Sequence, residues 1–192
     1  MVDVQTIVQG ELRRRLDLVG ALLDVRLESL VRGKHRNKNW DVAVHFAKRP
    51  CLAISTKAII SNPSGTVPNR IDDAMGECVN VHAFDPGMVL GYLFVFDARW
   101  LPSGGSRNWS DTLAGSLASF SGRRSEHDAP ELFEAATLLI VDFVPALPEL
   151  RFHPDLLNWD EFFDVLVGHV RVRQPLIDRY LGLLTGGADP SP

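Results

Sequence analysis

The sequence predicts an α/β sandwich, with helices on both sides of a mixed sheet of four or five strands. Alternating apolar and polar residues at 41–46 and 51–57, joined by a turn at 47–50, predict an antiparallel hairpin. Mostly apolar runs at 88–96 and 137–144 predict strands that are buried on both faces. Segments with helical spacing of apolar residues flank these runs, so we expect the later strands to be parallel.

Length and composition indicate a soluble protein with one sizeable core. The chain has 192 residues, of which 45% are hydrophobic and 23% charged, and we expect one domain over residues 1–185 with a disordered tail at 186–192. The formal net charge of −4 gives no general sign of nucleic-acid binding, so any contact with DNA needs a local basic patch or metal ions that offset acidic repulsion. The N-terminus does not resemble a signal peptide and no apolar run is long enough to span a bilayer, which favours a cytoplasmic protein without membrane association.

The remaining segments complete the predicted order of elements: helix, hairpin, helix, strand, helix, strand, helix. Apolar residues at helical spacing predict a long first helix over residues 3–30 and a terminal helix over 159–184. A Pro-, Gly- and Ser-rich segment predicts a loop at 61–68, followed by a helix with Asn69 as its N-cap. We further expect a turn at 85–87, helices near 111–120 and 128–136, and a loop at 145–154.

The stretch from Trp40 to Glu77 contains the residue types that could hold a hard cation beside a phosphate. Asp41 opens the first strand of the hairpin, and Ser55 and Lys57 lie on one face of the second strand because they are two residues apart. The following helix has a polar face, separate from its apolar stripe, that consists of Arg70, Asp73 and Glu77. Magnesium prefers oxygen ligands and needs two or three from the protein, while a lysine stabilises developing negative charge.

A basic loop precedes Asp41 and could reach a phosphate held there. Its cations are Lys34, Arg36 and Lys38. Arg70 is either a phosphate contact or an ion-pair partner of Asp73 or Glu77. Taken singly, Asp41 could cap a strand, Lys57 could be a solvated strand end, and the loop could simply be solvated.

Four blocks in this region resemble the PD-(D/E)XK nuclease superfamily, and most closely the XhoI-like type II restriction endonucleases. The blocks are WDVAV, AISTK, NRIDDAMG and GYLFVF, within residues 35–97, and they occur in the family's order with comparable spacing. The resemblance implies a restriction-endonuclease-like three-layer sandwich and a metal site that contains Asp41 and Lys57. An acid on the first helix, Glu11 with Glu28 as the alternative, would hold a metal-bound water.

Ser55 departs from the family pattern, which has a glutamate at this position. Restriction enzymes of the NgoMIV type resemble this chain, since a Ser-x-Lys strand there is followed by a glutamate on the next helix that restores the metal site. By this resemblance Glu77 completes the site, with Asp73 as the other choice. The alternative is that the substitution has inactivated the site.

The resemblance implies a DNA endonuclease that depends on Mg²⁺, for which Mn²⁺ may substitute, and that acts in restriction or anti-phage defence. The competing hypothesis is a degenerate nuclease fold that binds DNA or serves as an assembly subunit. Cutting both strands of DNA needs two sites, and the chain is short for a site-specific enzyme. We therefore expect a homodimer or a subunit of a larger defence complex.

Overall fold

The computed structural model describes residues 3–16, 23–102, 107–144, 148–174 and 176. Its helices are α1 (Val4–Arg15), α2 (Pro63–His82), α3 (Trp109–Phe120) and α4 (Trp159–Arg173), with a 3-10 turn at Ala98–Trp100. Its strands are β1 (Leu23–Val31), β2 (Lys38–Phe46), β3 (Arg49–Ile59), β4 (Val89–Asp97), β5 (Ala135–Asp142) and β6 (Glu149–Phe152).

The strands form one mixed sheet in the order β1-β2-β3-β4-β5-β6. The hairpins β1–β2, β2–β3 and β5–β6 are antiparallel, whereas β3–β4 and β4–β5 are parallel. The predicted α/β class, the β2–β3 hairpin and the two parallel crossover strands are therefore confirmed. The predicted strand number of four or five is wrong, because the sheet has six strands.

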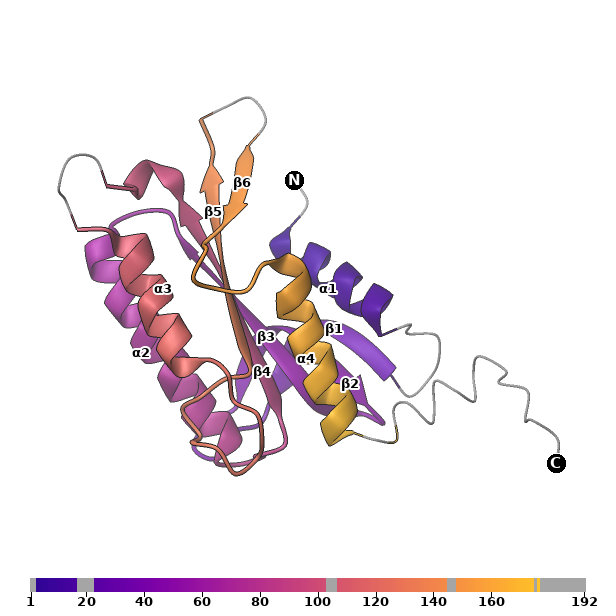
Figure 1. Ribbon diagram of the computed structural model, residues 1–192. Coiled ribbons are helices and arrows are strands. Elements are labelled where there is room, and N and C mark those ends of the chain that lie inside the picture. The colour runs from indigo at the N-terminus through magenta and orange to yellow at the C-terminus, as the bar shows by residue number, and fades with distance from the viewer. Residues whose placement is uncertain (1–2, 17–22, 103–106, 145–147, 175, 177–192) are drawn as a thin grey trace.

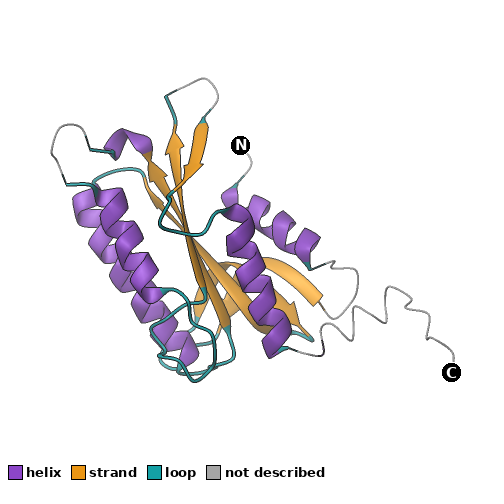
Figure 2. Ribbon diagram, viewed as in Figure 1, coloured by secondary structure: helices purple, strands orange, loops and turns teal. Residues whose placement is uncertain are grey.

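Helices cover both faces of the sheet, which gives three layers (Figures 1 and 2). Under α2 and α3, large aromatic side chains of the sheet form one core, including Trp40, Tyr92 and Phe94. Under α1 and α4, aliphatic residues of β1–β4 pack on Phe162 and Phe163. Within the described residues, no helix has both the length and the apolarity needed to cross a membrane.

The first predicted helix is wrong at residues 23–30, because Leu23–Val31 forms strand β1. Residues 17–22 of the predicted helix lie outside the described residues. The leucines that suggested helical spacing also fit a strand, since Leu23, Val25 and Leu27 alternate with polar residues. Pairing with β2, from Leu23 opposite Phe46 to Val31 opposite Lys38, decides in favour of the strand. A local pattern that fits two periods is thus settled by a long-range partner.

The second helix begins earlier than predicted, at Pro63 rather than after Asn69. The loop predicted at 61–68 is wrong from Pro63 onward, because Pro63 stands in the first turn of the helix, where the missing N–H of proline costs nothing. Asn62 takes a left-handed conformation and begins the helix, and Pro68 is accommodated inside it.

Two further predictions near the C-terminus are wrong. Residues 128–134 form turns instead of a helix, and β5 begins at Ala135. The expected loop at 145–154 contains β6, a short and mostly exposed edge strand that pairs with β5. The terminal helix extends to Arg173, and the rest of its predicted range from 177 and the predicted tail at 186–192 lie outside the described residues. The helix near 111–120 is confirmed as α3.

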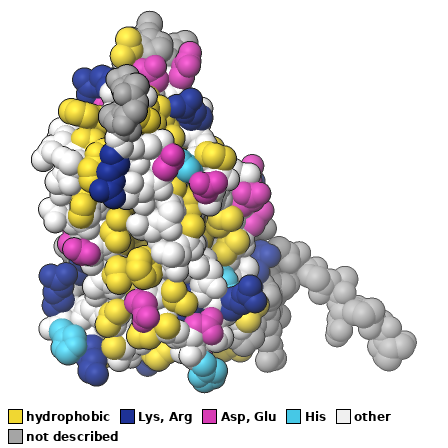
Figure 3. Space-filling view, turned by 60° about the vertical axis from the view of Figure 1, so that its left-hand side comes forward, with side chains coloured by type: hydrophobic (Ala, Val, Ile, Leu, Met, Phe, Trp, Pro, Cys, Tyr) yellow, Lys and Arg dark blue, Asp and Glu magenta, His cyan; other side chains and the backbone are white. Residues whose placement is uncertain are grey.

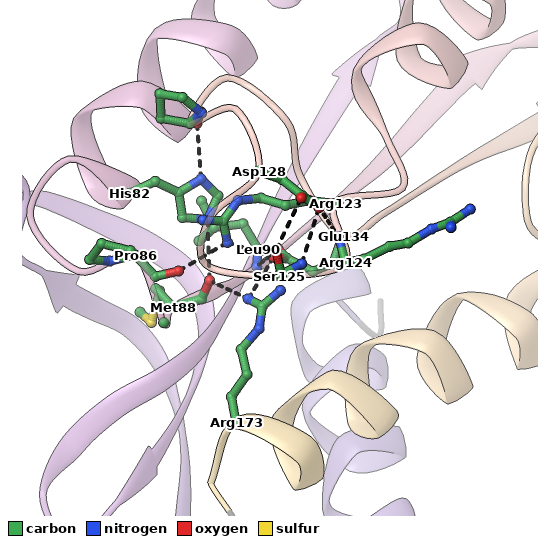
Figure 4. Close-up of polar contacts among 12 residues, drawn as sticks. His82, Pro86, Met88, Leu90, Arg123, Arg124, Ser125, Asp128, Glu134 and Arg173 are labelled. Atoms are coloured by element: carbon green, nitrogen blue, oxygen red, sulfur yellow. Dashed lines mark hydrogen bonds and ion pairs between the residues drawn. The ribbon is translucent and has the colours of Figure 1, made fainter.

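A buried ion-pair cluster joins α4 to the start of β5 (Figure 4). Glu134 is fully buried and accepts hydrogen bonds from Arg123, at 3.1 Å, and Arg173, at 2.6 Å. Its other oxygen accepts the backbone N–H of Leu90, at 2.7 Å. Arg123 and Arg173 also donate to the carbonyls of Pro86 and Met88, so the cluster fastens the turn before β4. A buried carboxylate is tolerable when it is paired in this way.

The contact between β4 and α4 yields a first prediction. A Cβ at Gly91 would lie 2.7 Å from Cδ1 of Leu166 and 3.1 Å from Cζ of Phe162. We therefore expect Gly91→Ala to lower the free energy of unfolding in urea by about 1–3 kcal/mol through overpacking. The matched control is Gly10→Ala in α1, where a Cβ meets nothing within 4 Å. That control should be neutral or stabilising by up to about 1 kcal/mol, and equal effects of the two substitutions would contradict this packing.

Candidate functional site

Asp41 lies where β2 and β3 stop pairing. The hairpin register continues through Val42 opposite Ile54 and ends there. Beyond this pair, the Asp41 carboxylate accepts hydrogen bonds from the Thr56 backbone N–H, at 2.6 Å, and from the Ser55 hydroxyl, at 3.1 Å. A side chain thus satisfies a backbone donor that strand pairing would otherwise satisfy. The two strands separate, and Asp41 is fixed in the fork between them.

The opposite side of the Asp41 carboxylate meets α1 and β1. Gln5 Nε2 donates to Oδ1 of Asp41 at 2.9 Å and to Oε1 of Glu28 at 3.1 Å. Glu28 lies across from Asp41, between the pairs Leu27–Val42 and Ser29–Trp40, and its φ of 47° is left-handed. One amide therefore links two carboxylates at a partly exposed position.

Strands β1 and β2 exchange faces at this point. Val25 and Val42 pack in the core under α1 and α4, whereas Val31 and Trp40 pack in the core under α2 and α3. In a regular strand, residues an even number of positions apart lie on the same face of the sheet, so Val25 and Val31, and likewise Trp40 and Val42, would share a core. The irregular backbone at Glu28 accounts for the exchange in β1, and the Asp41 position accounts for it in β2.

Lys57 and Glu77 approach each other on the α2 side of β3. Lys57 Nζ lies 3.5 Å from Glu77 Oε1, and Lys38 also donates to that oxygen. Glu77 Oε2 accepts from the Tyr92 hydroxyl at 3.0 Å. Lys38 Nζ lies 5.4 Å from the centre of the Trp40 ring. This lysine–glutamate cluster carries two cations and one anion, in a largely buried setting.

The charges of this cluster alter the proton affinities of its members. Burial lowers the pKa of Lys38, and the neighbouring Lys57 adds to this effect, while Glu77 opposes it. Burial raises the pKa of Tyr92 well above its usual value, with Cys78 and Glu77 contributing. Tyr92 is therefore a neutral hydroxyl that donates to the carboxylate at physiological pH.

The structure brings together Asp41 with Ser55, and Lys57 with Glu77 and Lys38. Because Ser55 and Lys57 are two residues apart on β3, these two groups are adjacent. Glu77 was predicted on the polar face of its helix, but it is 5% exposed and lies on the sheet-facing side. Its spacing from Ala74 and Val81, three and four residues away, places it in the buried stripe of α2.

Other predicted residues lie apart from the fork. Glu11 pairs with Arg14 and Arg15 in the C-terminal half of α1, whereas Gln5 lies in its first turn. The two arginines lower the pKa of Glu11 to about 2. Asp73 pairs with Arg70 at 3.4 Å on the exposed side of α2, which matches the predicted ion-pair alternative for Arg70.

The basic loop is tied to α2 by Asn80. The backbone N–H of Lys34 donates to the Asn80 carbonyl at 2.8 Å, and the Asn80 amide donates to the Arg36 carbonyl at 2.8 Å. A Cβ at Gly33 would lie 1.9 Å from Asn80 Nδ2, so the close approach requires glycine. The side chains of Lys34 and Arg36 are exposed. On the α2–α3 side, basic side chains are scattered among acidic and apolar ones (Figure 3).

Gln5 and Tyr92 are the contacts that sequence reasoning missed. Gln5 gives no signal in the sequence, because a polar residue near a helix start is ordinary. Tyr92 belongs to the apolar GYLFVF block, and a tyrosine among buried residues usually needs a partner for its hydroxyl. That requirement could have indicated a polar group on the covering helix.

The donors around the fork suit a hard cation by type. They are carboxylate and hydroxyl oxygens from Asp41, Glu28 and Ser55, and magnesium favours such ligands while keeping several waters. The Gln5 amide presents its N–H group to both carboxylates. In the ranges that the structure describes, no three His, Cys, Asp or Glu side chains converge as a cation-binding group. Any cation here would rest on one or two carboxylates, with Asp41 the better positioned.

The lysine–glutamate cluster yields a prediction about stability. We expect Glu77→Gln to lower the free energy of unfolding by about 3 kcal/mol, because it leaves Lys38 and Lys57 without a buried counter-charge. A double-mutant cycle with Lys38→Met, measured by urea unfolding, should give a coupling energy of about 1–3 kcal/mol. The exposed Arg70–Asp73 pair on the same helix is the control, with an expected coupling below about 1 kcal/mol. Equal coupling in the two pairs would show that Glu77 is not held as described.

The lowered pKa of Lys38 yields a prediction about pH. Because the folded-state pKa lies below the usual 10.5, the unfolded chain binds more protons between these two values. The free energy of unfolding should therefore rise with pH in that window, relative to a variant without this group. We expect the difference between wild type and Lys38→Met, measured by urea unfolding, to shift in favour of wild type as pH approaches 10.5. A pH-independent difference would contradict the lowered pKa.

Comparison of the chain with protein-family models, with curated proteins and with solved structures finds no match in any of the three. The PD-(D/E)XK resemblance therefore rests on the four sequence blocks.

Proposed function

We propose that this protein is a metal-dependent DNA endonuclease of the PD-(D/E)XK type with a restriction-endonuclease-like fold. The observation that carries the proposal is the fork at Asp41. An acid at the point where two strands separate, a lysine two residues beyond the opposing Ser55, and a helix glutamate on that lysine come from three different elements. Isolated surface residues would not be expected to meet in this way.

Each residue has a role in the proposed reaction. Mg²⁺, with Mn²⁺ as a substitute, would activate a water and offset charge on the phosphoryl oxygens. Asp41 would hold the cation, with Glu77 as the second acid of the Ser-x-Lys variant and Asp73 as the alternative. Lys57 orients the water or stabilises the developing charge, and Ser55 keeps the Asp41 carboxylate in place through its hydroxyl.

Glu28 is a further choice for the second acid. It reaches Asp41 through the Gln5 amide, whereas Glu11 is committed to two arginines. If Glu28 serves as the second acid, Glu77 instead fixes Lys57 and Lys38 in position. Lys34 and Arg36 are the exposed cations available to DNA phosphates, and Lys38 and Arg70 would contribute after leaving their present partners.

The proposed setting is cytoplasmic restriction or anti-phage defence, with the protein acting as a homodimer or within a larger complex. A second candidate is a degenerate nuclease fold that binds DNA or supports an assembly. Two observations favour it. Ser55 replaces the acid of the family pattern, and the Glu77 carboxylate is already paired with Lys38 and Lys57. Catalytic activity separates the two candidates.

The test is cleavage of plasmid and linear DNA in Mg²⁺ or Mn²⁺ by wild type, Asp41→Asn and Lys57→Met. We expect both substitutions to slow cleavage by about 10²–10⁴-fold, because each removes a group that acts on the reacting phosphate. The matched control is Lys48→Met, which changes an exposed lysine in the β2–β3 turn and should cleave normally.

Three further variants identify the second acid: Glu77→Gln, Glu28→Gln and Asp73→Asn. The second acid is Glu28 or Asp73 if the corresponding variant loses activity while remaining folded by circular dichroism. It is Glu77 if Glu77→Gln is the only one of the three that does so, because loss of Glu77 also releases Lys57. If wild type does not cut in either metal but binds DNA with a salt-dependent affinity, the degenerate fold is the correct account. If it neither cuts nor binds DNA, both candidates fail.

A further inference from the structure

A cavity of about 540 Å³ lies between the end of β1 and the β2–β3 turn. It is enclosed by the end of β1, the β2–β3 turn, the C-terminal end of α2 and the segment before β4. This volume falls within the range of small-molecule sites, which is about 300–1,000 Å³. None of the residues placed in the nuclease site lines it.

Six apolar side chains line this cavity, and two of them are unusually exposed to solvent. Leu30 is 58% exposed and Phe84 is 51% exposed, although both are large hydrophobic residues. They adjoin buried residues in the same cavity, and the apolar lining consists of Leu30, Val31, Pro50, Val81, Phe84 and Met88. An exposed apolar surface that is concave and continuous with the core marks a binding site more often than a bare surface does.

Basic residues dominate the charged part of the lining. Arg32, Lys48 and Arg49 contribute three cations, against one carboxylate from Asp85. Arg32 lies 5.9 Å from the centre of the Phe84 ring, so one cation is held directly over the apolar wall. The excess of positive charge beside an apolar surface favours a ligand that is both apolar and anionic.

His45 places a polar group in the wall of the cavity. It is 5% exposed, and Nε2 lies 2.8 Å from the Ser29 hydroxyl. Its Nδ1 is shielded from solvent. Burial lowers the pKa of His45, with Arg26 adding to the effect, so the ring is neutral at physiological pH. His45 therefore adds a neutral polar side chain to the lining of the cavity.

We propose that this cavity binds a small apolar anion, such as an aromatic or aliphatic carboxylate or sulfonate. The apolar body of the ligand contacts Leu30, Phe84 and Met88, and its anionic group faces Arg32, Lys48 and Arg49. The proposal is independent of nuclease activity, because it involves no residue of the fork at Asp41.

The test is fluorescence titration of the full chain with 1-anilinonaphthalene-8-sulfonate, an apolar aromatic anion. Its neutral comparator is N-phenyl-1-naphthylamine, which has the same rings without the sulfonate. We expect one anion bound per chain, and about tenfold weaker binding of both probes to Phe84→Ala, which removes an aromatic wall.

The charge arm of the test uses the Lys48→Gln/Arg49→Gln double variant. It should weaken binding of the anionic probe about fivefold, as expected for the loss of two partly exposed cations, and leave the affinity for the neutral probe unchanged. The control is Arg124→Gln, an exposed arginine outside this cavity, which should change neither affinity.

Three results would overturn the proposal. The first is that Phe84→Ala binds both probes as wild type does. The second is that the binding of the two probes changes equally in the charge variant. The third is that sedimentation velocity shows a dimer whose formation depends on Phe84, which would assign the surface to a second copy of the chain. Circular dichroism and urea unfolding of each variant establish that it is folded before titration.

Discussion

The loss of pairing between β2 and β3 beyond Val42–Ile54 is the constraint on which the candidate site depends. Backbone donors exposed by such a separation must find other partners, and here the Asp41 carboxylate accepts the Thr56 N–H. The same carboxylate receives Ser55 from β3 and Gln5 from α1. One acidic side chain thus replaces strand pairing and also joins three elements at an accessible point.

Two buried glutamates illustrate different uses of charge in this fold. Glu134 is enclosed by two arginines and a backbone N–H, and it fastens α4 to the turn before β4. Glu77 has two lysines and a tyrosine hydroxyl near it, and one of these lysines retains appreciable exposure. A cluster that keeps a solvent-accessible cation beside a fork in the sheet is better suited to chemistry than one sealed in the core.

Local sequence patterns sufficed for the central part of the fold. Alternation over 41–46 and 51–57 and the apolar run at 88–96 correspond to β2, β3 and β4. The predictions failed where a local pattern was ambiguous or weak. The leucines of 23–31 fit a helix or a strand equally well, and residues 149–152 are too exposed and too few to signal an edge strand by themselves.

The sequence by itself determined which residue types are available and on which face of their own element most of them lie. It placed Asp41 in the first strand of the hairpin and paired Ser55 with Lys57 on one face of the second, because side-chain direction follows from backbone period. The tertiary structure alone decided which elements meet: Gln5 and Glu28 with Asp41, and Glu77 with both lysines. The hydrogen bonds and ion pairs among these residues join positions 20 to 39 residues apart. Sequence spacing carries no information about them until the sheet and its covering helices have packed.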